Sequence, residues 1–293
     1  MKQIRLKAYA KVNLFLRVLG LDKRGRHGMD SFKCSVGLAD EIDIAIRGDR
    51  RVSIRMDLAI DAKNNAEAAA EGLIKKFGLP GVDILIKKGI PLAAGLGGSS
   101  AAAAAVIYGL KKLFGLPDFD CSVYGDDVPF MLTGGVCFDG QRADEAKKNA
   151  VLDALSGYSL LIVKPFGGLI TKDVFCRYDG LGLFKPKERG DSPDIAGLCR
   201  GILERDYQKI RANVYNDLYK AALSLRPDIE RVERDILEEG AVAAVMSGSG
   251  NAFVGLFETD KSAGLAEASL TRKGIYESVT VCGVRPAGIE TVG

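Results

Sequence analysis

The chain has 293 residues and a formal net charge of +3; 47% of its residues are hydrophobic and 27% are charged. This length fits one large domain or, more readily, two of ordinary size, with enough apolar residues for a core. The small net charge and the absence of Trp give no case for a nucleic-acid partner.

No apolar run is long enough to cross a bilayer, and the first residues lack the apolar stretch of a signal peptide, so no membrane role is expected. The six cysteines include no C-x-x-C pair, and with a single His they form no recognisable zinc pattern. These features predict reduced thiols in a cytoplasmic protein.

One or two strands are predicted over residues 4–19, where apolar positions alternate from Val12 onward. In this pattern Lys11 and Asn13 share one face of an otherwise apolar stretch. Lysine is rarely buried unless it is paired. Lys11 is therefore either an edge-strand side chain that reaches solvent or a functional cation.

A charged loop over residues 22–28 contains His27, which alone is a weak signal. Strands are predicted over 32–37, 41–47 and 52–56. A helix then opens at 64–65 and ends near Phe77, because Gly78 and Pro80 stop it. A strand over 82–87 leads into a glycine-rich loop.

That loop, residues 91–100, reads Pro-Leu-Ala-Ala-Gly-Leu-Gly-Gly-Ser-Ser and runs into five alanines. Gly95, Gly97 and Gly98 permit a positive φ and a close approach of backbone N–H groups to a ligand. A helix is predicted from there to about residue 114, so the loop would direct unpaired amides and a positive dipole end at one anion. Ser99 and Ser100 are candidates to cap this helix or to contact a phosphate or its metal ion.

The alternatives for this loop are an ordinary glycine-rich turn or another glycine motif. A Walker loop needs Lys where Gly98 stands, and a dinucleotide motif needs a third Gly where Ser100 stands. A hydrolase elbow is also approximated, but its His follows the nucleophile, whereas His27 precedes it. We therefore expect a phosphate-binding loop.

Residues 125–130 read Gly-Asp-Asp-Val-Pro-Phe, and the chain is expected to turn here because Pro129 restricts Val128 to extended geometry. Asp127 either caps a short helix over 128–132 or acts as a base beside the phosphate loop. Residues 140–150 are polar and weakly patterned. They suggest the passage between two domains, 1–155 and 156–293.

The second half alternates strands and helices in a βαβ-like manner. Its predicted strands are 160–165, 242–246, 252–258 and 278–284. Its predicted helices are around 194–223, 227–239 and 260–273. A second glycine-rich turn follows at residues 247–251, which read Ser-Gly-Ser-Gly-Asn.

Five segments together resemble the GHMP small-molecule kinases: residues 10–16, 91–102, 125–130, 216–218 and 246–250. They occur in the family's order and span most of the chain. The resemblance implies an α+β fold with an N-terminal nucleotide-binding domain and a C-terminal ferredoxin-like domain. The active site would lie in the cleft between them, and the protein would be an ATP-dependent kinase that uses Mg²⁺ to bridge the phosphates.

Within the family, the segments around Lys11, His27 and Asp127 are most similar to one branch of enzymes, which act in the non-mevalonate isoprenoid pathway. That branch phosphorylates the 2-hydroxyl of 4-diphosphocytidyl-2-C-methyl-D-erythritol. The resemblance implies that Asp127 is the base and that Lys11 positions the hydroxyl. A lysine beside an aspartate also keeps the carboxylate ionised.

The resemblance also implies binding residues. ATP would contact Asn65, Pro91, Ala94, Gly95, Leu96, Gly97, Gly98, Ser99, Ser100 and Ala101. The substrate would contact Asn13, Arg26, His27, Thr171, Phe175, Ser247 and Gly248. His27 would hydrogen-bond the cytosine and Phe175 would stack on it. No metal ligand is identified, although Ser99 or Ser100 could contact Mg²⁺.

The chain departs from this branch at three places. Arg26 stands where Tyr is usual, the glycine loop is one glycine shorter, and the segment between Gly115 and Gly125 is truncated. Two alternatives remain. One is a GHMP kinase for another alcohol such as mevalonate or homoserine, which needs no His27. The other is a GHMP-fold protein that binds nucleotide without catalysis and has no use for a base. The sequence leaves the oligomeric state open.

Overall fold

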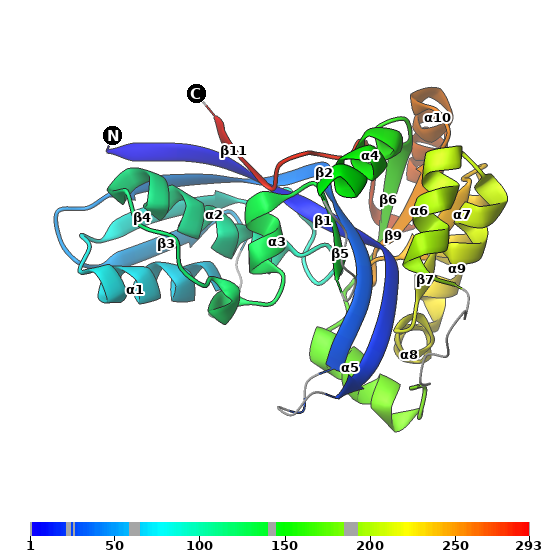
Figure 1. Cartoon of the computed structure of the whole chain (residues 1–293), viewed down its shortest axis with the longest axis horizontal. Helices are drawn as coiled ribbons and strands as arrows, with labels where there is room; N and C mark the ends of the chain where they lie inside the picture. Colours follow the sequence, from blue (N-terminus) through cyan, green and yellow to red (C-terminus); the bar gives the residue numbers. More distant parts are fainter. Residues whose placement is uncertain are drawn as a thin grey trace.

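The computed structural model describes residues 2–21, 25, 27–58, 65–139, 145–184 and 193–292. In these ranges the chain forms a seven-stranded and a four-stranded β-sheet, each with its own helices. Figure 1 shows them as two lobes, joined by the long strands β1 (Gln3–Leu21) and β2 (His27–Ile46). None of the described helices is long and apolar enough to cross a membrane.

The first sheet has the strand order β11-β1-β2-β4-β3, with β5 paired to β2 and β7 paired to β1. Two helices, α1 (Asn65–Phe77) and α2 (Gly98–Phe114), pack against each other beneath it. The five buried alanines at residues 101–105 of α2 have small side chains, so this helix approaches the sheet closely. The other strands of this sheet are β3 (Val52–Met56), β4 (Val82–Lys87), β5 (Val136–Asp139), β7 (Tyr215–Asn216) and β11 (Ile289–Val292).

The second sheet has the order β10-β6-β9-β8, and all its neighbouring strands are antiparallel. Counted along the chain, this is the order 4-1-3-2 of a ferredoxin-like fold. The predicted alternation of strands and helices is confirmed, and β6 and β8 run parallel without touching. The strands are β6 (Ser159–Pro165), β8 (Ala243–Met246), β9 (Phe253–Phe257) and β10 (Tyr276–Cys282).

Helices surround the second sheet. The amphipathic helix α9 (Glu230–Glu238) and helix α10 (Asp260–Arg272) bury Ile236 and Leu270 in the same apolar cluster as Leu161 and Val163 of β6. The remaining helices of this part are α5 (Thr171–Gly180), α6 (Ile195–Glu204), α7 (Tyr207–Asn213), α8 (Tyr219–Leu225) and the 3₁₀ turn η2 (Pro227–Ile229).

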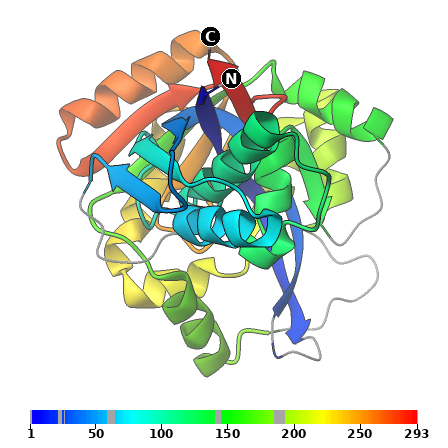
Figure 2. The same ribbon diagram turned by 90° about the vertical axis from the view of Figure 1, so that its left-hand side faces the viewer.

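Two features differ from the expectation for the first half. The strands predicted over 32–37 and 41–47 are one strand, β2, which continues down to α5 (Figure 1). The last strand, β11, returns to the first sheet, where Val292 pairs with Arg5 of β1. Figure 2 shows β11 beside the start of β1.

The proposed domain boundary after residue 155 stays a prediction. Within the segment 140–150, which was expected to be a passage, residues 145–150 belong to helix α4 (Glu145–Leu155). Val151 and Leu155 bury one side of this helix, and α4 packs against α6. The sparse apolar pattern of its first turns gave no helical signal.

Candidate active site

A cavity of about 330 Å³ lies where the glycine loop, β1, β2 and the start of α5 meet. It brings together residues that are distant in sequence, from Lys11 to Ser249. Most of the predicted site residues line it: Lys11, Asn13, Pro91, Ala94, Gly95, Leu96, Gly97, Gly98, Ser99, Ser100, Asp127, Thr171, Phe175 and Gly248. Lys33 and Asp139, which the sequence analysis did not single out, line it as well.

The glycine loop ends in a helix N-terminus. Gly95 and Gly97 have φ values of 75° and 74°, and Gly97 is the N-cap of α2. The expectation that Ser99 or Ser100 caps this helix is therefore wrong, because α2 begins at Gly98 and both serines lie in its first turn. The left-handed conformation of Gly97 ends the loop two residues before Ser99, and the two serines line the cavity instead.

A buried carboxylate fixes the beginning of the loop. Asp40 of β2 accepts hydrogen bonds from the backbone N–H groups of Gly89 (3.0 Å) and Ile90 (2.9 Å). It also forms an ion pair with Lys88, and both side chains are buried. Burial raises the pKa of Asp40, and Lys88 opposes this. The end of β4 is thereby attached to β2 just before the glycine loop.

The second glycine turn packs on the first. Ser247 Oγ accepts a hydrogen bond from Asn13 N and donates one to Gly95 O, both at 3.1 Å. Asn216 Nδ2 donates to the carbonyls of Met246 (2.7 Å) and Gly248 (2.8 Å). Ser247 is fully buried. Its contacts join the two glycine segments, whereas Gly248 lines the cavity.

Lys11 is only 5% exposed on β1, which has β11 and β2 on its two sides. The alternative of an edge-strand lysine that reaches solvent is therefore wrong. Its ammonium group donates a hydrogen bond to Asn13 Oδ1, as their shared face predicted. Burial lowers the pKa of Lys11, while the negative charge of Asp127 acts in the opposite direction.

Asp127 precedes the short helix α3 (Val128–Thr133), but its side chain makes no capping hydrogen bond. Instead, Lys33 Nζ lies 2.9 Å from Asp127 Oδ1 and 2.9 Å from Asp139 Oδ2. The direct partner of Asp127 is thus Lys33, and Lys11 acts on it through space. The cap interpretation of Asp127 is wrong.

The charges around Asp127 decide its protonation. Burial favours the neutral carboxyl, but Lys11 and then Lys33 outweigh it and keep the pKa of Asp127 below its ordinary value. Burial also favours neutral Lys33, yet Asp127 and Asp139 raise its pKa above the ordinary value for lysine. The cavity therefore holds an ionised carboxylate that is paired with the Lys33 ammonium group and lies in the electrostatic field of Lys11.

Two aromatic rings pack together at the start of β2. His27 stacks on Phe175 of α5 with ring centroids 5.2 Å apart and an angle of 19° between the rings. His27 Nε2 lies 3.2 Å from Asp179 Oδ2. The two residues expected to hold a nucleobase are thus neighbours, although His27 is not part of the cavity lining. Arg26 lies outside the described residues.

Other predicted residues lie around the cavity. Gly125 faces both Asn65 and Ser100: a Cβ at Gly125 would lie 3.7 Å from Asn65 Nδ2 and 3.6 Å from Ser100 Oγ. Asn65 is the first residue of α1 and is not part of the cavity lining. Ala101 is buried in the first turn of α2. Thr171 Oγ1 lies 2.9 Å from Ser249 Oγ, which joins the start of α5 to the second glycine turn.

This arrangement supplies the elements that phosphoryl transfer requires. Backbone amides at a helix N-terminus can hold phosphate oxygens. An ionised carboxylate can accept a proton, and two cations can stabilise developing negative charge. Among the described residues there is no group of three or more His, Cys, Asp or Glu side chains that could hold a metal ion.

Comparisons with known proteins agree on one family. The family models described as GHMP kinases N terminal domain and GHMP kinases C terminal match residues 64–135 and 197–275. The 4-diphosphocytidyl-2-C-methyl-D-erythritol kinase of Moorella thermoacetica is 35% identical over 264 residues, which cover 87% of this chain and 90% of that protein. The kinase of the same name from Acetivibrio thermocellus is 32% identical over 280 residues, covering 92% and 95%.

Solved structures show the same fold. A crystal structure of 4-(cytidine 5'-diphospho)-2C-methyl-D-erythritol kinase superposes with a TM-score of 0.74 at 23% identity, over 96% of this chain and 99% of that one. A homoserine kinase from Cytophaga hutchinsonii superposes with a TM-score of 0.71 at 20% identity, over 100% and 98%. The predicted α+β, two-domain fold class is confirmed.

Proposed function

Because the chain belongs to the GHMP kinase family, it is a small-molecule kinase, and we propose that its acceptor is the 2-hydroxyl of 4-diphosphocytidyl-2-C-methyl-D-erythritol. The observation that carries this choice is identity of 35% and 32%, over most of the chain, to two kinases that bear this substrate's name. All six cysteines are free thiols. Such thiols are typical of a reducing compartment, so we place the reaction in the cytoplasm.

In the proposed reaction the acceptor oxygen attacks the terminal phosphorus of ATP, the bond to the ADP oxygen breaks, and Asp127 accepts the hydroxyl proton. The lowered pKa of Asp127 keeps its carboxylate ionised and ready to accept that proton. Lys11 and Lys33 stand beside the carboxylate and stabilise negative charge as it develops on the transferred group. Phosphoryl transfer depends chiefly on such positioning and charge stabilisation.

The glycine loop fits the phosphates of ATP. At Gly95 and Gly97 the backbone has a positive φ, and a Cβ at Gly97 would lie 2.1 Å from Met131 Cε. Only glycine therefore lets the amides lie open toward the cavity at these positions. Mg²⁺ commonly binds through substrate phosphates with few protein ligands. The hydroxyl of Ser99 or Ser100 would be a protein contact for the ion, which would neutralise phosphate charge.

We assign the cytidine end of the substrate to the place where the start of β2 meets α5. Phe175 lines the cavity and His27 stacks against it. His27 Nδ1 is buried and has no hydrogen-bond partner in the described part of the chain. A pyrimidine edge could satisfy this nitrogen and its ring could stack on Phe175, which is the role that the resemblance implies for these residues.

A coupled kinase assay tests the proposal. Purified protein with ATP and Mg²⁺ should phosphorylate the cytidylated substrate with a kcat/KM far above those for mevalonate and homoserine. Higher efficiency on mevalonate or homoserine would move the chain to another branch of the family. Binding of ATP without turnover of any of the three alcohols would favour the non-catalytic alternative.

A further inference from the structure

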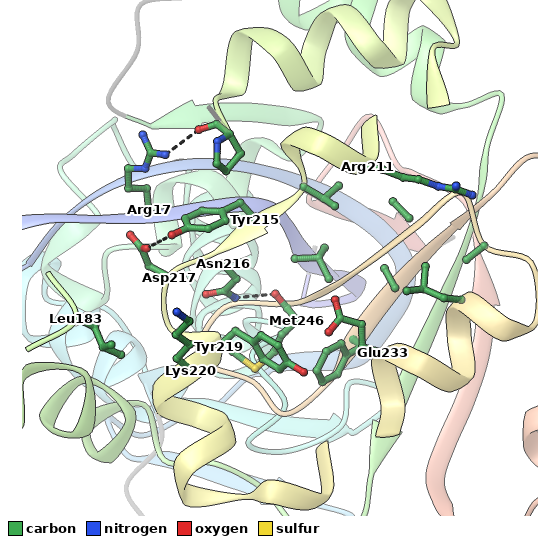
Figure 3. Close-up of a pocket in the computed structure, with 18 residues that line it drawn as sticks. Arg17, Leu183, Arg211, Tyr215, Asn216, Asp217, Tyr219, Lys220, Glu233 and Met246 are labelled. Atoms are coloured by element: carbon green, nitrogen blue, oxygen red, sulfur yellow. Dashed lines mark hydrogen bonds between the residues drawn. The ribbon is translucent and has the colours of Figure 1, made fainter. Parts of the chain in front are cut away.

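A second and larger cavity, of about 830 Å³, lies in the second lobe and shares no lining residue with the catalytic cavity. It is bounded by β1, β7, α8, α9 and the edge strand β8. Figure 3 shows the side chains around it. Successive residues of a strand point to opposite faces. Accordingly Leu16 lines the catalytic cavity and Arg17 lines this one.

Arg17 is the unusual member of this lining. Its side chain is only 8% exposed, and its guanidinium group stands 5.5 Å from the Phe15 ring centroid and 5.6 Å from that of Tyr215. Nη2 donates to Pro193 O at 2.8 Å. Nη1 is buried without a hydrogen-bond partner among the described residues. A buried arginine donor without a partner is rare in proteins.

Asp30 of β2 stands opposite Arg17 in the strand pairing, yet among the described residues no carboxylate lies within ion-pair distance of Arg17. Asp217 Oδ2 accepts a hydrogen bond from Val18 N at 2.7 Å, and its other oxygen accepts one from Tyr215. Glu233 lies on the opposite side of the cavity in Figure 3. Lys220 lies on the same side as Arg17 in that view and adds a second cation.

One wall of the cavity is apolar. Ala243, Val245, Met246 and Phe253 of the second sheet line it, and Leu237 of α9 closes one side. Ligand cavities of this size are typically apolar with a few polar groups that fix the orientation of the ligand. Arg17 and Lys220 are placed to do this for a negative headgroup.

We propose that this cavity binds a small amphiphilic anion. Its phosphate or carboxylate headgroup would lie at Arg17 and Lys220, and its apolar body would lie along β8. An anion would give Arg17 Nη1 the acceptor that the described residues do not supply, and a planar guanidinium group suits both headgroups. The proposal does not depend on the substrate of the kinase reaction.

One wall of this cavity continues into the catalytic one. Asn216 and Met246 line the anion cavity, and Asn216 holds the carbonyls of Met246 and Gly248. Gly248 lines the catalytic cavity. An occupant therefore rests against the segment that carries the second glycine turn, without entering the active site.

Calorimetric titration of the full chain with n-hexyl phosphate tests this assignment. A non-hydrolysable ATP analogue, present at saturation, blocks the catalytic cavity. We expect hexyl phosphate to bind with the analogue present, and hexanoate to bind as well. Inorganic phosphate and n-hexanol, which each lack half of the ligand, should bind at least about tenfold more weakly. Absence of binding, or its loss when the analogue is added, would overturn the proposal.

Variants locate the headgroup. Arg17→Met should weaken hexyl phosphate at least about tenfold, since a charge-assisted hydrogen bond is lost. Arg272→Met, an exposed arginine at the end of α10, is the matched control and should bind normally. Because Arg17 is buried, its replacement also affects the packing of the core. Lys220→Glu replaces an exposed residue at the edge of the cavity and provides a second test, with Lys261→Glu on α10 as its control. Normal binding by Lys220→Glu, or by a folded Arg17→Met, would refute the site.

Discussion

Asp127 is the residue on which the proposed chemistry depends most directly. Asp127→Asn keeps the size of the side chain and its place beside Lys33 but removes the proton acceptor. We expect kcat to fall by about 100- to 10,000-fold, the usual contribution of a general base. ATP affinity, measured by calorimetry, should remain nearly unchanged because the glycine loop is untouched. Unaltered turnover would remove Asp127 from the mechanism.

Lys33 should set the pH range in which Asp127 is active. The wild-type carboxylate stays ionised until the pH falls through its lowered pKa, so the rate should decline on the acid side as this group is protonated. Lys33→Met removes one of the two cations, raises the pKa of Asp127 and should move the acid limb of kcat/KM to higher pH. The rate at neutral pH should also fall by about tenfold or more, because a fixed cation beside the reacting group is lost.

The matched control for Lys33→Met is Lys87→Met, which replaces an exposed lysine of β4. It should leave the pH profile as in the wild type. A profile of Lys33→Met that differs only in height, with the acid limb in its original place, would show that Lys33 does not tune Asp127.

The difference between Lys11 and Lys33 shows what the sequence can and cannot reveal about single residues. Lys11 was identified because it interrupts an apolar strand and belongs to a family motif. Lys33 alternates with Phe32, Cys34 and Val36 and shares its face with Ser35, so the pattern gave no sign that it is buried. Its two partners were not open to prediction either, because Asp127 and Asp139 reach it only through the pairing of β2 with β5 and the placing of α3.

Among the secondary-structure elements, glycine and proline residues predicted the ends of several helices and strands well. The helix expected to end at Phe77 and the strand expected over 82–87 have those limits in the structure. The length of β2 was missed. The polar residues around Asp40 suggest an interruption between two strands. In the structure Asp40 is buried and accepts hydrogen bonds from the backbone just after β4. Local polarity cannot reveal a partner 49 residues away.

The attachment of β4 to β2 through Asp40 can be tested by its removal. Asp40→Ala leaves Lys88 buried without its counter-ion and frees the N–H groups of Gly89 and Ile90. We expect a loss of about 3–5 kcal/mol in the free energy of unfolding, measured in urea. KM for ATP should rise as well, since the glycine loop begins at this point.

Asp43→Ala is the control from the same strand. Asp43 forms its ion pair with Arg5, whose side chain is 61% exposed, so its removal should cost less than about 1 kcal/mol. Similar losses for the two variants would mean that the buried pair does not hold the loop in place.

For the whole molecule, the meeting of the two glycine segments is what brings the lobes together at the active site. Ala252 N donates to Ala94 O at 3.1 Å, and Ser247 bonds both to Asn13 and to Gly95. The family resemblance implied a cleft between two domains, but no local pattern could reveal this contact, because it joins residues about 150 positions apart. Glycine at position 95 is required here for space as well as for backbone conformation.

Gly95→Ala should therefore cost more than an ordinary glycine replacement. A Cβ at Gly95 would lie 2.1 Å from the carbonyl oxygen of Ser247, so the lobes must shift apart. Gly115, at the other end of α2, also has a positive φ but has open space around it. Gly115→Ala should lose about 1–2 kcal/mol from the strained φ alone, and Gly95→Ala about 1–3 kcal/mol more from the collision.

Urea unfolding measures both losses, and KM for ATP reports the geometry of the loop. We expect KM to rise in Gly95→Ala and to stay at the wild-type value in Gly115→Ala, because only the first variant moves the phosphate-binding amides away from Lys11 and Asp127. Equal losses of stability with unchanged KM would mean that the lobes tolerate separation at this contact. The site would then be assembled by β1 and β2 alone.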